Sequence, residues 1–170
     1  MKVLVSIIMG STSDWPIMEQ AAKFLDEMSI PFEVNALSAH RTPNIVEEFA
    51  RSASKRGIKV IIAGAGGAAH LPGVVAAATT LPIIGVPCNS KISVDGRDAV
   101  SSILFMPPGI PVATVGIDAA KNAAILATQI IALSNSKVNK QFVEFKNNLK
   151  QKVTDANLTL KKYKFKNRVN

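Results

Sequence analysis

The chain has 170 residues, of which 48% are hydrophobic and 5% aromatic, so it suits a single domain whose core needs no disulfide or structural metal. Its single cysteine, Cys88, excludes an internal disulfide and is expected to be a small packed residue, and no apolar run is long enough to cross a membrane, which together favour a cytoplasmic protein. The net charge of +8 comes from residues 137–170, which hold ten basic and two acidic residues, and we interpret them as a solvated helix and tail rather than a nucleic-acid site.

Apolar strands and helical segments alternate along the chain. In order, we predict strand 3–9, helix 13–28, strand 31–37, helix 43–56, strand 59–63, helix 71–80, strand 82–86, helix 95–103, strand 111–116 and helix 119–133. Thr42 and Asp118 are the expected N-caps of the second and the last of these helices, and Gly57 is expected to end the second. The opening run is interpreted as a buried strand rather than a signal peptide, because it is short and leads into a turn.

This alternation implies right-handed crossovers and a parallel sheet covered by helices on both faces. We therefore predict a three-layer α/β/α domain with a flavodoxin-like or Rossmann-like sheet over residues 1–135. Residues 136–170 are expected to form a basic C-terminal helix and tail that extends from this core. The helix, over about 137–152, has an apolar stripe that is expected to pack on a neighbouring subunit, and its residues are Val138, Phe142, Phe145 and Leu149.

The first candidate site follows the first strand, where GSTSD opens a helix. Ligands of open parallel sheets bind beyond the carboxyl ends of the strands, and a helix N-terminus favours a phosphate. Gly10 allows close approach of the backbone, and Ser11 and Ser13 supply hydroxyl groups. Asp14 would repel a phosphate and suits a ribose hydroxyl better. The alternative is that Ser13 or Asp14 merely caps the helix.

A second candidate site, SAHRTP, follows the second strand. Arg41 can clamp a phosphate through its planar fork, and Ser38 adds a hydroxyl group. Histidine is the side chain that changes protonation near neutral pH, so His40 suits proton transfer. A structural histidine bonded to the backbone explains His40 equally well, and the residues alone leave both interpretations open.

A third candidate site, GAGGAAH, follows the third strand. Its G-x-G-x-x-A pattern is typical of dinucleotide-binding proteins, but it does not follow the first strand, and no acidic residue lies about twenty positions on to hold a ribose. Gly66 and its neighbours are expected to bring backbone close to a flat ligand. His70 faces the same crevice, either as a catalytic group or as a loop histidine bonded to the backbone.

GSTSDW, SAHRTP and AGAGGAAHLPG, in this order and spacing, closely resemble the PurE family, the phosphoribosylaminoimidazole carboxylase catalytic subunits that are also called N5-carboxyaminoimidazole ribonucleotide mutases. The resemblance continues through LPIIGVP, GRDAVSSI, MPPGIPVATV and KNAAILATQI, and covers roughly residues 2–133. The chain departs from the family at GIDAAKNAA, which is shorter than the usual glycine-rich version, and the tail beyond about Lys150 matches nothing in it.

The resemblance implies a role for each candidate residue. It implies a phosphate site at Ser11, Ser13, Ser38 and Arg41, a ribose ligand at Asp14, a wall around the imidazole and its carboxylate at Gly66, His70 and Leu71, and a general acid/base at His40. It also implies a small-molecule ribonucleotide substrate, an octamer with C-terminal helices packed across subunits, and neither a metal nor an organic cofactor.

The implied reaction belongs to de novo purine biosynthesis and moves a carboxylate from N5 to C4 of the imidazole. Arg41 favours this mutase over the related carboxylase class, which uses free CO2 and typically has lysine at that position. Direct CO2-dependent carboxylation of the same ribonucleotide is one alternative. A flavin- or nucleotide-binding module that uses GSTSD as its phosphate loop is another, from a different functional class.

Overall fold

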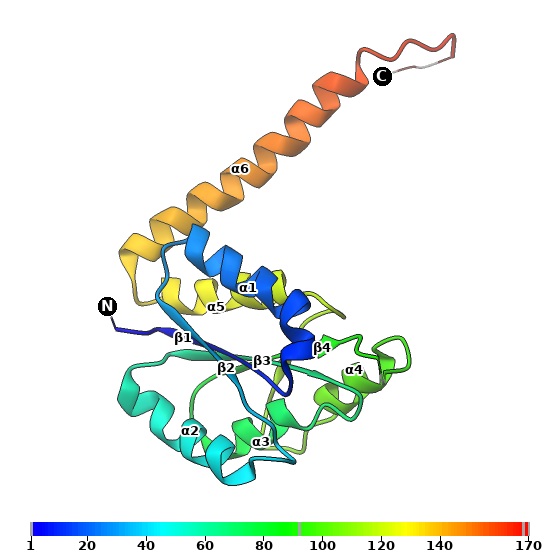
Figure 1. Cartoon of the computed structure of the whole chain (residues 1–170). Coiled ribbons are helices and arrows are strands. Elements are labelled where there is room, and N and C mark those ends of the chain that lie inside the picture. The colour runs from blue at the N-terminus through cyan, green and yellow to red at the C-terminus, as the bar shows by residue number, and fades with distance from the viewer. Residues whose placement is uncertain (1, 92, 168, 170) are drawn as a thin grey trace.

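The computed structural model describes residues 2–91, 93–167 and 169 (Figure 1). Five parallel strands form one sheet in the order β2-β1-β3-β4-β5. The strands are β1 (Val5–Met9), β2 (Phe32–Ala36), β3 (Val60–Gly66), β4 (Ile83–Cys88) and β5 (Ala113–Thr114). This is the flavodoxin-like strand order, and the predicted three-layer α/β/α class is confirmed.

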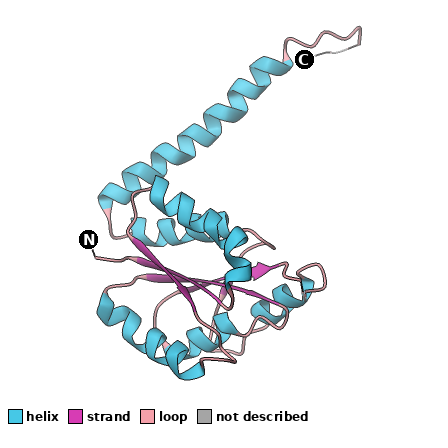
Figure 2. Ribbon diagram, viewed as in Figure 1, coloured by secondary structure: helices cyan, strands magenta, loops and turns pink. Residues whose placement is uncertain are grey.

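Helices cover both faces of the sheet (Figures 1 and 2). One face carries α1 (Trp15–Glu27), α5 (Ala120–Ala132) and the start of α6 (Ser136–Leu160), and the other carries α2 (Pro43–Arg56), α3 (Leu71–Ala78) and α4 (Arg97–Leu104). Neighbouring residues of β1 serve the two faces, since Ile7 belongs to the first core cluster and Ile8 to the second. Both side chains are completely buried, which explains why this strand is apolar apart from Ser6 rather than alternating.

Several predicted boundaries differ from the structure. The helix expected from residue 13 starts at Trp15, after a 3-10 turn over Thr12–Asp14. β3 and β4 run further than predicted, to Gly66 and Cys88, while β5 is shorter. Three residues of the predicted GAGGAAH loop therefore belong to β3 itself, and the site begins directly at the end of the sheet.

Two capping predictions also need correction. Thr42 is the N-cap of α2 by position, but its hydroxyl donates to the Ser38 carbonyl (3.1 Å) and makes no capping bond to the described helix. Asp118 is not the N-cap of α5; Ala119 is, and the Asp118 carboxylate accepts the backbone N–H of Asn89 instead (2.8 Å). Gly57 ends α2 in the left-handed conformation (φ 100°), as predicted.

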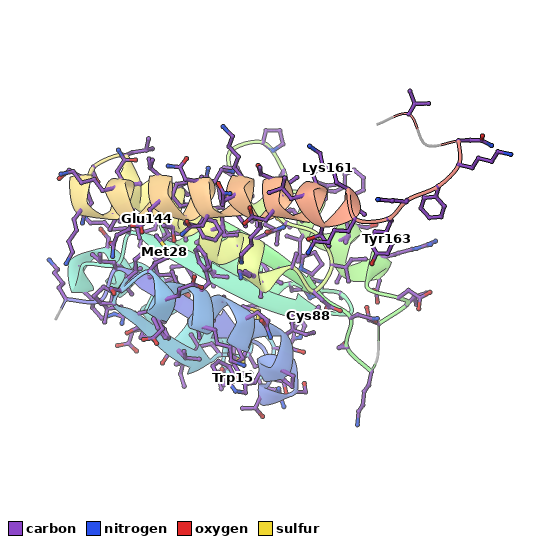
Figure 3. All side chains as sticks on the ribbon, turned by 90° about the horizontal axis from the view of Figure 1, so that it is seen from above. Trp15, Met28, Cys88, Glu144, Lys161 and Tyr163 are labelled. Atoms are coloured by element: carbon purple, nitrogen blue, oxygen red, sulfur yellow. The ribbon has the colours of Figure 1, made fainter. Side chains whose placement is uncertain are left out.

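The C-terminal helix α6 is longer than predicted and extends beyond the body of the domain (Figure 1). Its first turns join the core through Val138 and Phe142, and Phe145 packs edge-to-face on Phe24 with ring centroids 5.0 Å apart. Every residue from Lys146 to the end of the helix is exposed. Figure 3 shows Met28 and Glu144 where α6 crosses the body, and Tyr163 at its far end. None of the described helices has the length and apolar character needed to span a membrane.

Candidate active site

A pocket of about 680 Å³ lies at the carboxyl end of the sheet, and the loops after β1, β2, β3 and β4 all line it. Every site residue predicted from the sequence lies in its wall: Ser11, Ser13, Asp14, Ser38, His40, Arg41, Gly66, His70 and Leu71. These loops converge because the strands are parallel, so their carboxyl ends meet at one edge. The structure thus brings three separate sequence motifs into one site.

The loop after β1 carries a buried carboxylate, that of Asp14. Ser11 is the N-cap of the 3-10 turn, and its hydroxyl accepts the backbone N–H of Ser13 at 3.2 Å. Asp14 is only 5% exposed, and its side chain makes no capping bond to the described part of α1. Capping therefore does not explain Asp14. Burial raises the pKa of its carboxyl group, opposed by a hydrogen bond from Ser13 and reinforced by the nearby charge of Asp118.

The loop after β2 holds Arg41 in a defined position. Its Nη2 donates to the carbonyl of Gly10 at 3.0 Å, and both its Nε and its backbone N–H donate to the Ser38 hydroxyl at 3.2 Å. The guanidinium group therefore bridges the loops after β1 and β2. It remains exposed, so further donors can reach an anionic ligand in the pocket.

The two histidines of the chain meet across the pocket. His40 Nε2 lies 2.7 Å from His70 Nδ1, and the rings stand edge-to-face at 86° with centroids 4.9 Å apart. One of these nitrogens donates and the other accepts, so the contact fixes one proton between the rings. This geometry does not fit an interpretation of either residue as a histidine that only bonds to backbone, which the sequence left open.

The loop after β3 presents backbone to the pocket. Gly67 and Ala69 both adopt left-handed conformations, with φ of 60° and 38°, and Ala69 is buried. Such a conformation is unfavourable for alanine and is held here by the surrounding structure. It turns the chain sharply before α3, so that His70 points at His40 while Leu71 packs into the core.

Sequence reasoning missed the loop after β4, where Asn89, Ser90 and Lys91 also line the pocket. The rule that located the other loops applies here too, because polar NSK follows an apolar strand. Cys88, just before this loop, is completely buried, and burial raises the pKa of its thiol to about 12. The complete burial of Cys88 confirms the packed position expected for it.

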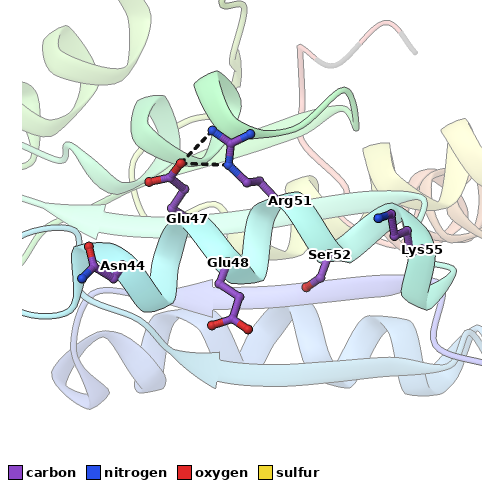
Figure 4. A pocket seen from close by; sticks show the side chains of 6 residues that line it. All are labelled: Asn44, Glu47, Glu48, Arg51, Ser52 and Lys55. Carbon is purple, nitrogen blue, oxygen red and sulfur yellow. Dashed lines mark hydrogen bonds and ion pairs between the residues drawn. The ribbon is translucent and has the colours of Figure 1, made fainter.

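A second hollow, of about 450 Å³, lies over the outer face of α2 (Figure 4). Side chains of this one helix line it, and Glu47 and Arg51 are tied together there by an ion pair of 2.7 Å. None of the predicted site residues is among them. The converging loops at the sheet edge, rather than this helix face, hold the candidate chemistry.

Comparison with known proteins gives a consistent result. The family model described as AIR carboxylase matches residues 4–152. The chain is 54% identical over 147 residues to N5-carboxyaminoimidazole ribonucleotide mutase of Pyrococcus abyssi, covering 86% of this chain and 84% of that protein. It is 52% identical over 158 residues to the mutase of Bacillus subtilis, covering 92% and 97%. The crystal structure of Treponema denticola PurE superposes with a TM-score of 0.83 and 30% identity, covering 93% and 98%.

Proposed function

The chain belongs to the AIR carboxylase family, and from this premise we propose that it is an N5-carboxyaminoimidazole ribonucleotide mutase of purine biosynthesis. It moves the carboxylate of the substrate from the exocyclic N5 to C4 of the imidazole, giving 4-carboxy-5-aminoimidazole ribonucleotide. The observation that carries this proposal is the convergence of three motif loops on one pocket, with His40 and His70 in direct contact inside it.

The phosphate of the ribonucleotide is assigned to the end of the pocket formed by the loops after β1 and β2. Ser11 and Ser13 lie at the N-terminal end of the 3-10 turn, where their hydroxyl groups can donate to an anion. Ser38 and Arg41 are already joined by hydrogen bonds and complete this end. Asp14, in the adjoining wall, is the ligand for a ribose hydroxyl.

The imidazole base of the ribonucleotide is assigned to the other end of the pocket, between the histidine pair and the Gly66 backbone. Protonation of N5 breaks the C–N bond of the carbamate and releases CO2 inside the pocket. The electron-rich C4 then attacks this CO2, and loss of the C4 proton restores the aromatic ring. One proton is taken up and one is released, so His40 can perform both transfers.

The pocket must hold the CO2 until C4 attacks it. The wall beside the histidines is built from small side chains and backbone, with Ala65 and Ala69 buried and Gly66 also lining the pocket. Such a wall lets a flat ring and a linear triatomic molecule approach closely. Holding both in contact replaces a bimolecular encounter with an intramolecular step.

We also propose a homo-octamer in the cytoplasm, with the part of residues 136–170 beyond Phe145 packing on a neighbouring subunit. The rest of the predicted stripe, Val138, Phe142 and Phe145, packs on the core of its own chain instead. Beyond Phe145, α6 exposes Leu149, Val153 and Leu158 to solvent in the single chain. A partner subunit would bury these side chains and remove them from water. Sedimentation velocity of the purified chain tests this assembly: a monomer at micromolar concentration would contradict it.

The mutase and the CO2-dependent carboxylase are separated by a substrate comparison. Purified protein at low concentration should convert the N5-carbamate ribonucleotide rapidly. It should convert the free amine only slowly, even with added bicarbonate. Faster turnover of the amine with bicarbonate would support the carboxylase instead, and no turnover of either would contradict both.

A further inference from the structure

Ser90 has no role in the site as described so far. It lies in the loop after β4 and lines the pocket, yet its hydroxyl Oγ is buried and, among the described residues, has no hydrogen-bond partner. Buried hydroxyl groups in native proteins are nearly always paired, because an unpaired one loses its bonds to water without replacement. The unpaired hydroxyl of Ser90 therefore suggests that a bound ligand supplies its hydrogen-bond partner.

The position of Ser90 puts that partner at the base end of the pocket. Ser90 packs directly against Gly66, where a Cβ atom would lie 2.7 Å from Ser90 Cβ and 2.9 Å from the carbonyl oxygen of Cys88. Only a residue without a side chain leaves Ser90 this space. Because Gly66 pairs with Cys88 across β3 and β4, the two loops are in register at this point.

Hydrogen bonds fix the Ser90 backbone on both sides. The Asp118 carboxylate accepts the N–H of Asn89 (2.8 Å), and the Asp118 N–H donates to Pro87 O (2.9 Å). Within the loop, Ser90 N–H donates to the carbonyl of Cys88 (2.9 Å) and Ser90 O accepts from Ser93 (2.9 Å). The backbone is held, so the side chain can turn about its Cα–Cβ bond without moving the loop.

We propose that Ser90 is a further substrate-binding residue, whose hydroxyl turns from Gly66 into the pocket and donates a hydrogen bond to the carboxylate that the enzyme transfers. A carboxylate only accepts hydrogen bonds, and an O–H donated to a charged oxygen is among the stronger kinds. Lys91 adds a positive charge to the same loop and favours an anion at this end. This assignment rests on the proposed function, since it names the carboxylated ribonucleotide as the ligand.

Ser90→Ala tests the proposal, with Ser93→Ala as the matched control in the same loop. Ser93 Oγ donates to Asp98 and accepts the N–H of Gly96 (3.1 Å), so its hydroxyl is paired and it does not line the pocket. Three quantities are measured for each variant and the wild type. They are the melting temperature, the affinity for 4-carboxy-5-aminoimidazole ribonucleotide by calorimetry, and the affinity for the same nucleotide without the carboxylate.

Ser90→Ala should bind the carboxylated nucleotide about tenfold more weakly, bind the other within about twofold, and melt no lower than wild type. Ser93→Ala should show the opposite pattern, a lower melting temperature with unchanged affinities. Equal losses for both nucleotides, no loss at all, or a lower melting temperature of Ser90→Ala would each overturn the proposal. A wild type that binds the carboxylated nucleotide but turns over no carbamate would contradict the proposed function, while the affinities would still decide the role of Ser90.

Discussion

The carboxyl edge of the sheet and the outer half of α6 are both polar and exposed, but their side chains are arranged in opposite ways. At the sheet edge, groups from four loops point into one pocket, and two histidines separated by thirty residues come within 2.7 Å. Along α6, every residue from Lys146 onward is exposed, and the hydrogen bonds there are local, such as Gln151 to Asp155 (2.9 Å).

This difference shows that the most highly charged region of the chain is not the region that holds the candidate active site. The outer half of α6 and the tail carry most of the excess positive charge of the chain, yet that charge is spread along one continuous stretch of sequence. The sheet edge has few ionisable groups, but they come from distant parts of the sequence and share a cavity. Convergence of this kind needs a folded sheet, and it identifies the functional region better than the density of charge does. Each prediction below tests one side of this comparison.

The largest effect is expected at the histidine pair. His40→Asn should lower kcat by a factor of about 100 to 10,000, the usual contribution of a general acid/base. Its melting temperature should match that of wild type, because His40 is exposed. His70→Asn is the control, and it should retain more activity, since it removes only the partner of the proton-transferring ring. Near-normal kcat in His40→Asn would show that His40 is not the catalytic group, although the converging loops place it in the pocket.

A smaller loss is expected at the phosphate end. Arg41→Ala should raise the KM for the ribonucleotide about 10- to 100-fold with little change in kcat, because it removes charged hydrogen bonds made equally by substrate and transition state. Arg41→Lys keeps the charge but loses the planar fork, and should give an intermediate KM. Steady-state kinetics of both variants checks this, and an unchanged KM in Arg41→Ala would remove the phosphate assignment.

Asp14 should show a conflict between stability and binding. Burial raises the pKa of its carboxyl in the folded protein, so the folded state binds its proton more readily than the unfolded chain does. This contribution lowers stability as the pH rises through the interval between the unfolded and the folded pKa, and the cost persists above it. Asp14→Asn should therefore melt higher than wild type at neutral pH, and this advantage should shrink in acid, while nucleotide affinity falls.

Melting curves from pH 3 to 8 for Asp14→Asn and wild type show directly whether the ionised Asp14 carboxylate lowers or raises the stability of the fold. An Asp14→Asn variant that melts lower at neutral pH would mean that the ionised carboxylate stabilises the fold. The same variant with unchanged nucleotide affinity would remove Asp14 from the ribose site.

The smallest effect is expected from the tail. Removal of residues 161–170 should leave kcat/KM within about twofold of wild type, since the described part of this segment does not line the pocket at the sheet edge and packs against neither core cluster. Steady-state assays at two salt concentrations check this. A large, salt-sensitive loss of activity would contradict this distinction between the two regions, because it would mean that the basic tail contributes to catalysis.

The sequence predicted the sheet edge well because parallel strands and their carboxyl ends follow from periodicity. His40, Arg41 and His70 could be placed near each other by that rule alone. The loop after β4 was missed because Asn89, Ser90 and Lys91 include no histidine, arginine or glycine cluster of the kind that singled out the other loops. Asp118 was misplaced because it adopts a left-handed conformation, with φ of 55°, that turns its side chain from α5 to Asn89.

The length of α6 was underestimated for a different reason. The prediction followed the apolar stripe from Val138 to Leu149, which records where the helix finds packing partners. The helix itself continues to Leu160, and residues 150–160 contain no glycine or proline that would interrupt it. Periodicity therefore reports burial, and a helix can continue beyond its packed part where no such residue stops it.

The central claim is that the carboxylate leaves N5 and reaches C4 without leaving the pocket. Labelling the carbamate carbon of the substrate with ¹³C, in the presence of excess unlabelled bicarbonate, tests it most directly. Mass spectrometry of the product should show the label retained in 4-carboxy-5-aminoimidazole ribonucleotide throughout the reaction. Product that carries unlabelled carboxylate from the first turnovers would contradict the account, because the CO2 would then come from solution.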